Sequence, residues 1–291
     1  MNTAPDRTRR DDFALSFEFF PPNTPAGASK LIGVRDRLAA FGPQFFSVTY
    51  GAGGVTRDKT LATVLEIAQS GHTVAPHLSC IGASRESMHE LLDLYRSHGI
   101  RRVVALRGDL PSGMFDAGDF RYASDLIEFI RADSGDWFHI EAAAYPEVHP
   151  QARSPRDDLE AFGRKMRAGA NSAITQYFFN PDAYFRFRDE ARRFGIDAPI
   201  VPGIMPIGNY TQLARFSDAC GAEIPRWIRQ RLAAFGDDLD SIRAFGIDVV
   251  SELCRRLLEQ DAPGLHFYTL NQAEASTAIL EAIGRAPQGQ R

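Results

Sequence analysis

Eight short apolar segments recur along this chain of 291 residues, and segments with helical periodicity separate them. Such alternation is typical of parallel strands joined by crossover helices. The expected strands are LSFEFF (15–20), FFSVTY (45–50), VAPHL (74–78), VVALRGD (103–109), EAAAY (141–145), AITQYFF (173–179), IVPGIM (200–205) and LHFYTLN (265–271). Eight strand–helix units are what a closed barrel requires, and about 250 residues is the usual size of that fold. The sequence therefore predicts an α/β protein, a single (β/α)8 TIM barrel.

The expected helices carry apolar residues three and four positions apart, as Leu31, Val34 and Leu38 do in the first of them. They span residues 26–41, 58–70, 84–98, 122–132, 157–168, 181–194, 210–220, 225–235, 240–260 and 273–283. An extra helix is expected between the seventh and eighth strands. The catalytic barrel then covers residues 13–284, with flexible tails at 1–12 and 285–291.

An open doubly wound sheet is the alternative architecture. That fold usually places a G-x-G-x-x-G turn directly after its first strand. Here Pro21 and Pro22 follow the first strand, and the glycine cluster at 51–54 has Thr56 where the last glycine is needed. The missing turn favours the barrel.

The composition argues against several classes of protein. A formal net charge of -4 offers no general attraction to nucleic acid or to an anionic membrane. The first residues lack the apolar core of a secretory signal, and no apolar run approaches the roughly 18 residues of a membrane span. The three cysteines are far apart and odd in number, so they show no metal-ligand spacing and no full disulfide set. We therefore expect a cytoplasmic protein with reduced thiols, no metal, and no nucleic-acid or membrane partner.

Polar residues stand at or near the carboxyl ends of the expected strands. In a (β/α)8 barrel the active site forms at those ends. The residues concerned are Glu18, Thr49, His77, Arg107, Asp109, Tyr145, Gln176 and Asn271. Their convergence predicts a reaction site.

Glu18 is the most informative of these residues, because it interrupts a run of phenylalanines. Side chains alternate along a strand, so Glu18 faces away from Phe17 and Phe19. In an apolar pocket its pKa would be raised, and the carboxyl could donate a proton near neutral pH. The alternative is a strand-end glutamate paired with a lysine or an arginine.

Arg107, Gly108 and Asp109 close the fourth expected strand. The glycine lets the backbone approach a ligand, and the arginine offers a planar fork to phosphate or carbonyl oxygens. An internal Arg107–Asp109 pair that closes a turn is the alternative. After the fifth strand, His149 between two prolines could line a flat ring or could be a plain surface residue.

A basic stripe, Arg164, Lys165 and Arg167, lies on the helix after the fifth strand and could hold phosphates or be merely solvated. Gln176 would present an amide, both donor and acceptor, to the edge of a heterocycle. A buried structural glutamine is the alternative reading of Gln176.

Taken together, these segments resemble methylenetetrahydrofolate reductase in its short bacterial form, which lacks the C-terminal regulatory domain. The matching stretches are FEFFPP, FFSVTYGAGG, APHLSCIGAS, GIRRVVALRGDLP, YASDL, AAYPEVHP, KMRAGANSAITQYFF, PGIMPI and HFYTLN. They follow the family order from Leu15 to about Gly284. The family is a flavin-bearing eight-fold barrel, in agreement with the strand count.

The resemblance implies FAD-dependent reduction of 5,10-methylenetetrahydrofolate to 5-methyltetrahydrofolate by NADH or NADPH in alternating, ping-pong hydride transfers. It assigns Glu18 as the acid that protonates a ring nitrogen of the folate, and Asp109 as a catalytic residue beside flavin and pterin. The implied FAD-binding residues are Tyr50, Ala52, His77, Arg107, Gly108, Asp109, Ala123, Tyr145, His149, Ala152, Asp158, Arg164 and Lys165. The implied substrate-binding residues are Thr49, Gln176, Gln212, Phe216 and Gln272. A folate and a nicotinamide nucleotide are the expected small-molecule partners, and a homo-oligomer is expected.

Two positions depart from the family pattern. Gln272 stands where the family often has arginine, so a charged fork for the glutamate tail of folate is missing. Ala161 replaces an asparagine and removes one polar contact to FAD. Alternative functions are a flavin-free folate methyltransferase or lyase on the same barrel, a flavin dehydrogenase of another small molecule, and a non-catalytic folate- or flavin-binding regulator.

Overall fold

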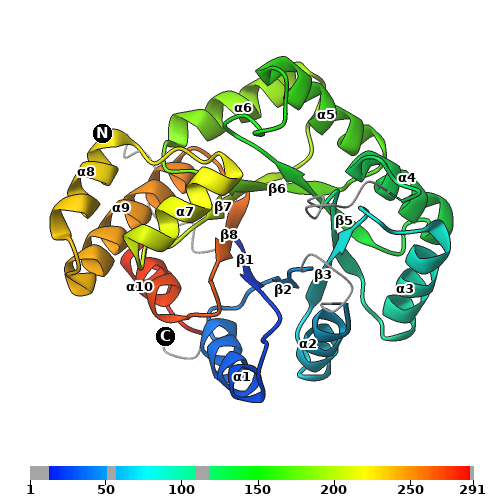
Figure 1. The fold of residues 1–291 in the computed structure, drawn as a ribbon, viewed down its shortest axis with the longest axis horizontal. Helices are drawn as coiled ribbons and strands as arrows, with labels where there is room; N and C mark the ends of the chain where they lie inside the picture. The colour runs from blue at the N-terminus through cyan, green and yellow to red at the C-terminus, as the bar shows by residue number, and fades with distance from the viewer. Residues whose placement is uncertain (1–12, 51–56, 109–117, 289–291) are drawn as a thin grey trace, which may run out of the picture.

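The computed structural model describes residues 13–50, 57–108 and 118–288. Within them, eight parallel strands form a closed barrel in chain order, and helices surround it (Figure 1). The strands are β1 (Ala14–Phe19), β2 (Phe45–Val48), β3 (Val74–Ser79), β4 (Arg102–Leu106), β5 (His139–Ala144), β6 (Ser172–Tyr177), β7 (Ile200–Ile204) and β8 (Gly264–Tyr268). Pairing of β1 with β8 closes the barrel. The predicted TIM barrel is therefore confirmed. The predicted tail at 1–12, the end of the other tail at 289–291, Ala52 and Asp109 lie outside the described residues.

The helices also follow the predicted positions to within about two residues. They are α1 (Pro25–Ala39), α2 (Arg57–Gln69), α3 (Arg85–Ser97), α4 (Ala123–Ser134), α5 (Pro155–Arg167), α6 (Pro181–Arg193), α7 (Tyr210–Cys220), α8 (Arg226–Phe235), α9 (Leu239–Glu259) and α10 (Glu274–Ala282). Short oxygen-bearing side chains such as Thr24, Ser154 and Asn209 accept hydrogen bonds from free N–H groups at helix starts.

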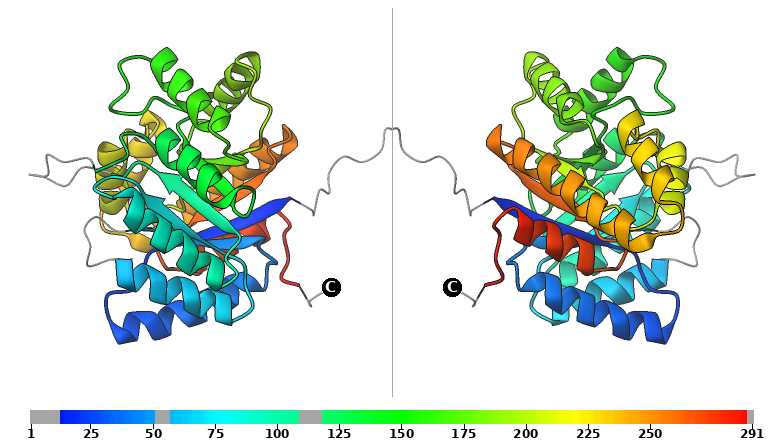
Figure 2. Two further views of the ribbon diagram at one scale, coloured as in Figure 1. Left: turned by 90° about the vertical axis from the view of Figure 1, so that its right-hand side faces the viewer. Right: turned by 90° about the vertical axis from the view of Figure 1, so that its left-hand side faces the viewer.

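The insertion between β7 and β8 carries extra helices, as the sequence predicts. Residues 205–263 are all described and form three helices, α7, α8 and α9, at the three predicted positions. A regular unit has one helix, so the insertion adds two and not the single extra helix counted from the sequence. The side views in Figure 2 show α9 and α10 packed next to each other beside the barrel.

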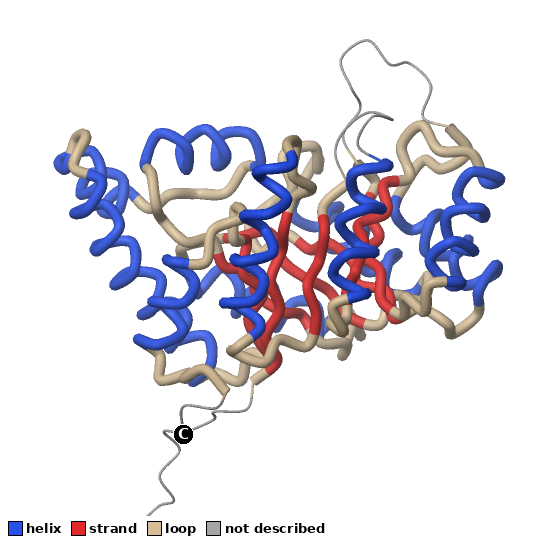
Figure 3. The backbone as a smooth tube through the Cα atoms, turned by 90° about the horizontal axis from the view of Figure 1, so that it is seen from below, coloured by secondary structure: helices blue, strands red, loops and turns tan. Residues whose placement is uncertain are grey.

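Alternation along each strand divides its side chains between two environments. Phe17, Phe19 and Phe46 face outward and pack in the core between barrel and helices, with the Phe19 and Phe46 rings stacked at 5.3 Å. The other side chains face the barrel axis, where Phe45 and Val104 belong to a small apolar cluster. Figure 3 shows the strands enclosed by helices. Glu18 therefore points into the barrel, as its spacing predicts.

A buried polar cluster lies toward the amino-terminal ends of β4, β5 and β6. The Glu141 carboxylate, buried to 2 % exposure, accepts a hydrogen bond from the guanidinium of Arg102. It also accepts one from Ser172 Oγ at 2.6 Å and lies 3.3 Å from His139 Nε2. Arg102 in turn lies over the Phe45 ring, 4.5 Å from its centroid. The barrel axis thus carries charge in place of the branched apolar layers usual for this fold.

No helix in the described part of the chain is long and apolar enough to cross a membrane. Among the same residues, no group of three His, Cys, Asp or Glu side chains gathers in a way that could hold a metal ion.

Candidate active site

A cavity of about 550 Å³ lies at the carboxyl ends of the strands. This volume falls within the roughly 300–1,000 Å³ of small-molecule sites. Of the residues singled out from sequence, eight line it: Glu18, Thr49, Tyr50, His77, Tyr145, His149, Gln176 and Phe216. They come from five different strands or their following loops and from α7, so only the closed barrel brings them together.

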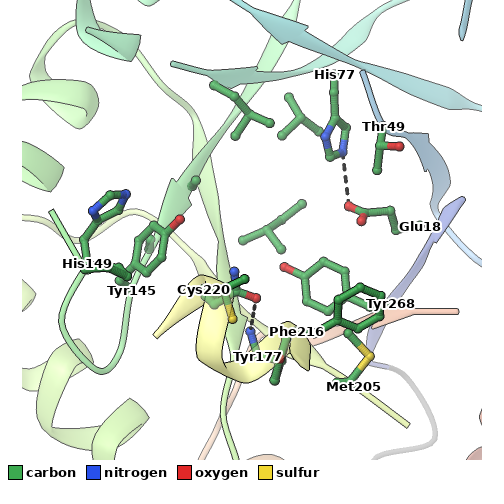
Figure 4. Close-up of a pocket in the computed structure, with 18 of the residues that line it drawn as sticks. Glu18, Thr49, His77, Tyr145, His149, Tyr177, Met205, Phe216, Cys220 and Tyr268 are labelled. Carbon is green, nitrogen blue, oxygen red and sulfur yellow. Dashed lines mark hydrogen bonds and ion pairs between the residues drawn. The ribbon is translucent and has the colours of Figure 1, made fainter. Parts of the chain in front are cut away.

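Glu18 lies in this cavity with its carboxyl facing the imidazole of His77 (Figure 4). His77 Nε2 lies 3.2 Å and His266 Nε2 lies 3.6 Å from Glu18 Oε2. Burial raises the pKa of the Glu18 carboxyl, but the neighbouring His77 and His266 outweigh burial and lower the pKa to about 2. The prediction that an apolar pocket raises the pKa of Glu18 is therefore wrong. Among the described residues, the partners of the Glu18 carboxyl are histidines and not a lysine or an arginine.

The backbone around Glu18 is tied to the chain that follows β8. Thr269 Oγ1 donates to the Glu18 carbonyl oxygen at 2.7 Å. The Asn271 side chain accepts from Phe20 N at 3.0 Å and donates to Phe20 O at 2.8 Å. Asn271 was expected to face the cavity, but it joins the ends of β1 and β8 instead.

Arg107 and Gly108 follow β4, where Arg107 contacts the side-chain oxygen of Gln151 and lies outside the cavity lining. Gly108 has a φ of +85°, and a Cβ there would lie 2.0 Å from Ser79 Oγ. Only glycine fits this turn without displacing Ser79, whose hydroxyl donates to Arg107 O at 3.2 Å.

We expect Gly108→Ala to lower the melting temperature, because it adds both backbone strain and a steric overlap. Gly99→Ala is the matched control. Gly99 also has a positive φ, +72°, but nothing lies within 4 Å of its added Cβ. Equal decreases in melting temperature for the two variants would show that the steric overlap with Ser79 does not destabilise the fold.

The loop after β5 carries His149 against Tyr145, with ring centroids 4.4 Å apart in an edge-on arrangement. Asp158 of α5 accepts a hydrogen bond from His149 N at 2.9 Å, and Ala152 N donates to His149 O at 2.8 Å. Asp158 and Ala152 therefore shape the loop that brings His149 to the cavity, which speaks against a plain surface histidine.

The basic residues of α5 divide between two places. Lys165 Nζ donates to the carbonyl oxygen of Ala143, a residue that lines the cavity. Removal of the ammonium from water lowers the pKa of Lys165 to about 8. Arg164 is exposed and lines a separate hollow of about 450 Å³ with Arg167 and the start of α4, where Ala123 is the first helical residue. The predicted cofactor residues thus fall into a group in the cavity and a group beside α4.

The predicted substrate residues also occupy two joined spaces. Gln176 lines the main cavity, and its Oε1 accepts a hydrogen bond from Tyr177 N at 3.0 Å. Gln212 and Gln272 line a smaller hollow of about 140 Å³. Phe216 borders both spaces, as do Met205, Tyr268 and Leu270.

Sequence reasoning missed two residues of the site. His266 is fully buried, and Ser16 Oγ lies 2.7 Å from its Nδ1. The Tyr268 ring lines the cavity, and its hydroxyl donates to Thr175 O at 2.6 Å. The segment LHFYTLN could have indicated both residues. Side chains alternate along a strand, so His266 and Tyr268 lie on the same face of β8.

A closed (β/α)8 barrel with a half-buried carboxyl beside imidazoles, in a cavity at the carboxyl ends of its strands, defines a barrel enzyme. The chain belongs to the methylenetetrahydrofolate reductase family, whose model matches residues 3–284. It is 42 % identical to 5,10-methylenetetrahydrofolate reductase of Escherichia coli, over 94 % of this chain and 91 % of that protein. It is 38 % identical to methylenetetrahydrofolate reductase (NADH) 1 of Arabidopsis thaliana, over 95 % of this chain but 49 % of that longer protein.

A solved structure from Clostridium thermocellum shares the fold. It matches with a TM-score of 0.65 at 17 % identity and covers 93 % of both chains. That protein binds two copies of 5-methyl-5,6,7,8-tetrahydrofolic acid. At this identity the likeness speaks for the fold alone.

Proposed function

We propose that this chain reduces 5,10-methylenetetrahydrofolate to 5-methyltetrahydrofolate with a bound FAD and NADH or NADPH as the reductant. The observation that carries the proposal is Glu18, a carboxyl inside the strand-end cavity of a chain that is 42 % identical to a bacterial reductase of this folate. The plant relative named for NADH favours that nucleotide as the reductant.

The residues present suit FAD. Gly108 permits the tight turn after β4, and Tyr50, Tyr145 and His149 offer flat walls in the cavity. Arg164 beside the start of α4 and Lys165 on the cavity side of α5 would each offer a positive charge to the cofactor. When bound, the flavin would accept a hydride from the nucleotide and donate it to the folate in alternating half-reactions.

The chain's own groups supply the proton and the orientation. Glu18 donates a proton to a ring nitrogen of the folate, which opens the five-membered ring to an iminium that accepts hydride. Gln176 binds the pterin edge and Thr49 helps to seat the nicotinamide. Phe216 stacks on whichever flat substrate is present, while Gln212 and Gln272 contact the polar end of folate from the smaller hollow. Asp109 acts beside flavin and pterin. A cytoplasmic homo-oligomer remains our prediction.

The test is the absorbance of the purified protein under anaerobic conditions. We expect a yellow protein whose flavin absorbance NADH bleaches and methylenetetrahydrofolate restores. A colourless protein that cannot be reconstituted with FAD would favour the flavin-free methyltransferase or lyase. A flavin that NADH reduces and this folate leaves reduced would favour a dehydrogenase of another molecule.

A further inference from the structure

The smaller hollow beside the main cavity has one charged residue in its lining. It lies between α7, α9, α10 and the chain that follows β7 and β8, and its volume is about 140 Å³. Arg243 of α9 is the only charged residue among the described residues that line it, while Asn209, Gln212 and Gln272 contribute amides. A hollow of this composition suits a negatively charged group that accepts hydrogen bonds.

The hydroxyl of Ser276 is a second sign that the hollow binds a ligand. Ser276 lies in the first turn of α10, lines the hollow and is fully buried. Its Oγ has no hydrogen-bond partner among the described residues. Buried hydroxyls are normally paired, because an unpaired one gives up its hydrogen bonds to water without replacement. An acceptor bound in the hollow would supply this partner.

The size and position of the hollow indicate which part of a ligand it takes. Small-molecule sites usually begin at roughly 300 Å³, so a hollow of about 140 Å³ accommodates one end of a ligand and not a whole one. Phe216, Met205, Tyr268 and Leu270 border both this hollow and the main cavity. A ligand whose rings fill the main cavity can therefore extend a short tail past Phe216 into the hollow.

Two carboxylates of the chain lie near these groups, and neither occupies the hollow. Asp240 Oδ1 lies 3.4 Å from Arg243 Nη1, but both side chains are exposed, and a pair of this kind adds little stability. Glu274 of α10 pairs with Arg37 at 2.6 Å and lines neither space. The Arg243 guanidinium can therefore exchange Asp240 for a carboxylate of a ligand.

We propose that Arg243 binds the carboxylates of the folate glutamate tail, and that Ser276 donates a hydrogen bond to the same tail. The inference rests on the proposed function, in which the rings of folate occupy the main cavity. Gln272 offers only a neutral amide, so Arg243 supplies the guanidinium of this hollow from the insertion helix α9. Arg243 is thus a specificity-determining residue that favours folates with a charged tail.

The test measures steady-state constants and binding affinity for Arg243→Gln. We expect the KM for methylenetetrahydrofolate to rise about 3- to 10-fold with kcat unchanged, because the tail is bound equally in the ground state and in the transition state. The KM for NADH should stay within about twofold. Isothermal titration calorimetry with 5-methyltetrahydrofolate should show the same loss of affinity, and the loss should shrink at high ionic strength.

Two further variants separate the charge from the packing. Gln272→Arg in the Arg243→Gln background returns a guanidinium to the same hollow and should restore most of the affinity. Ser276→Ala should weaken folate binding about 2- to 5-fold without lowering the melting temperature, because it removes a buried hydroxyl that lacks a partner. Arg229→Gln, the same change at an exposed residue of α8 that lines neither space, is the control and should match the unmodified protein.

An unchanged folate KM and affinity in Arg243→Gln would overturn the inference and leave the proposed function intact. A rise in the KM for NADH, alone or to the same extent, would assign the hollow to a phosphate of the nucleotide and would also overturn it. Unmodified enzyme whose flavin NADH reduces and the folate does not reoxidise would overturn the proposed function, and this inference with it.

Discussion

Glu18→Gln is expected to slow reoxidation of the reduced flavin by methylenetetrahydrofolate by about 10²- to 10⁴-fold, the usual contribution of a general acid. Flavin reduction by NADH should change little, because that hydride transfer needs no proton from Glu18. The glutamine keeps the size and polarity of the side chain but cannot supply the proton. Anaerobic stopped-flow absorbance resolves the two half-reactions.

Thr63→Ser is a matched control, since Thr63 lies on α2 and its hydroxyl only donates to Lys59 O at 2.8 Å. It should leave both half-reactions unchanged. If Glu18→Gln slowed the two half-reactions to the same extent, the carboxyl would be a general structural or cofactor-binding group, and its role as the acid would be wrong.

Glu141→Ala is expected to destabilise the fold by about 3–5 kcal/mol, the cost of leaving one member of a buried ion pair uncompensated. Arg102 would lose its carboxylate partner, and Ser172 Oγ would lose its acceptor. Chemical denaturation measures the change in the free energy of unfolding. Glu160→Ala is the control, because its partner Arg156 is exposed and such pairs contribute about 1 kcal/mol or less.

The same carboxylate makes stability depend on pH. Burial raises the pKa of Glu141, but His139, Arg102 and Ser172 outweigh it and hold the pKa below its ordinary value. A group with a lowered folded-state pKa contributes stability that is complete above the unfolded-state pKa and is lost as pH falls through the folded-state pKa. We expect the stability gap between the unmodified protein and Glu141→Ala to narrow at acidic pH. A gap that stays constant down to acid unfolding would contradict this account.

The fold was predictable because each strand is marked in the sequence by its own short apolar segment. In β1, the alternation of apolar and polar residues predicts that Phe17 and Phe19 face the helices and that Glu18 faces the barrel axis. The helices of the insertion before β8 were also predictable one by one, because α7, α8 and α9 each show ordinary helical periodicity.

The site was predictable only in part. A residue at the end of a strand can be recognised from its own segment, but the side chains that contact it come from other segments of the chain. Glu18 could be placed in the cavity from its own strand. The shift of its pKa could not be predicted, because it depends on His77 of β3 and His266 of β8, which reach the carboxyl only in the closed barrel. Asn271 was wrongly predicted to face the cavity. Its side chain instead forms hydrogen bonds with the backbone N–H and carbonyl groups of Phe20.

A crystal structure with bound FAD and 5-methyltetrahydrofolate tests the central claim most directly. We expect the flat rings of both molecules in the cavity of about 550 Å³. The Glu18 carboxyl should lie within hydrogen-bond distance, about 2.6–3.2 Å, of a pterin nitrogen or of one bridging water. A folate bound elsewhere, or one bound in the cavity with Glu18 still turned to His77 and His266 and out of its reach, would contradict the account.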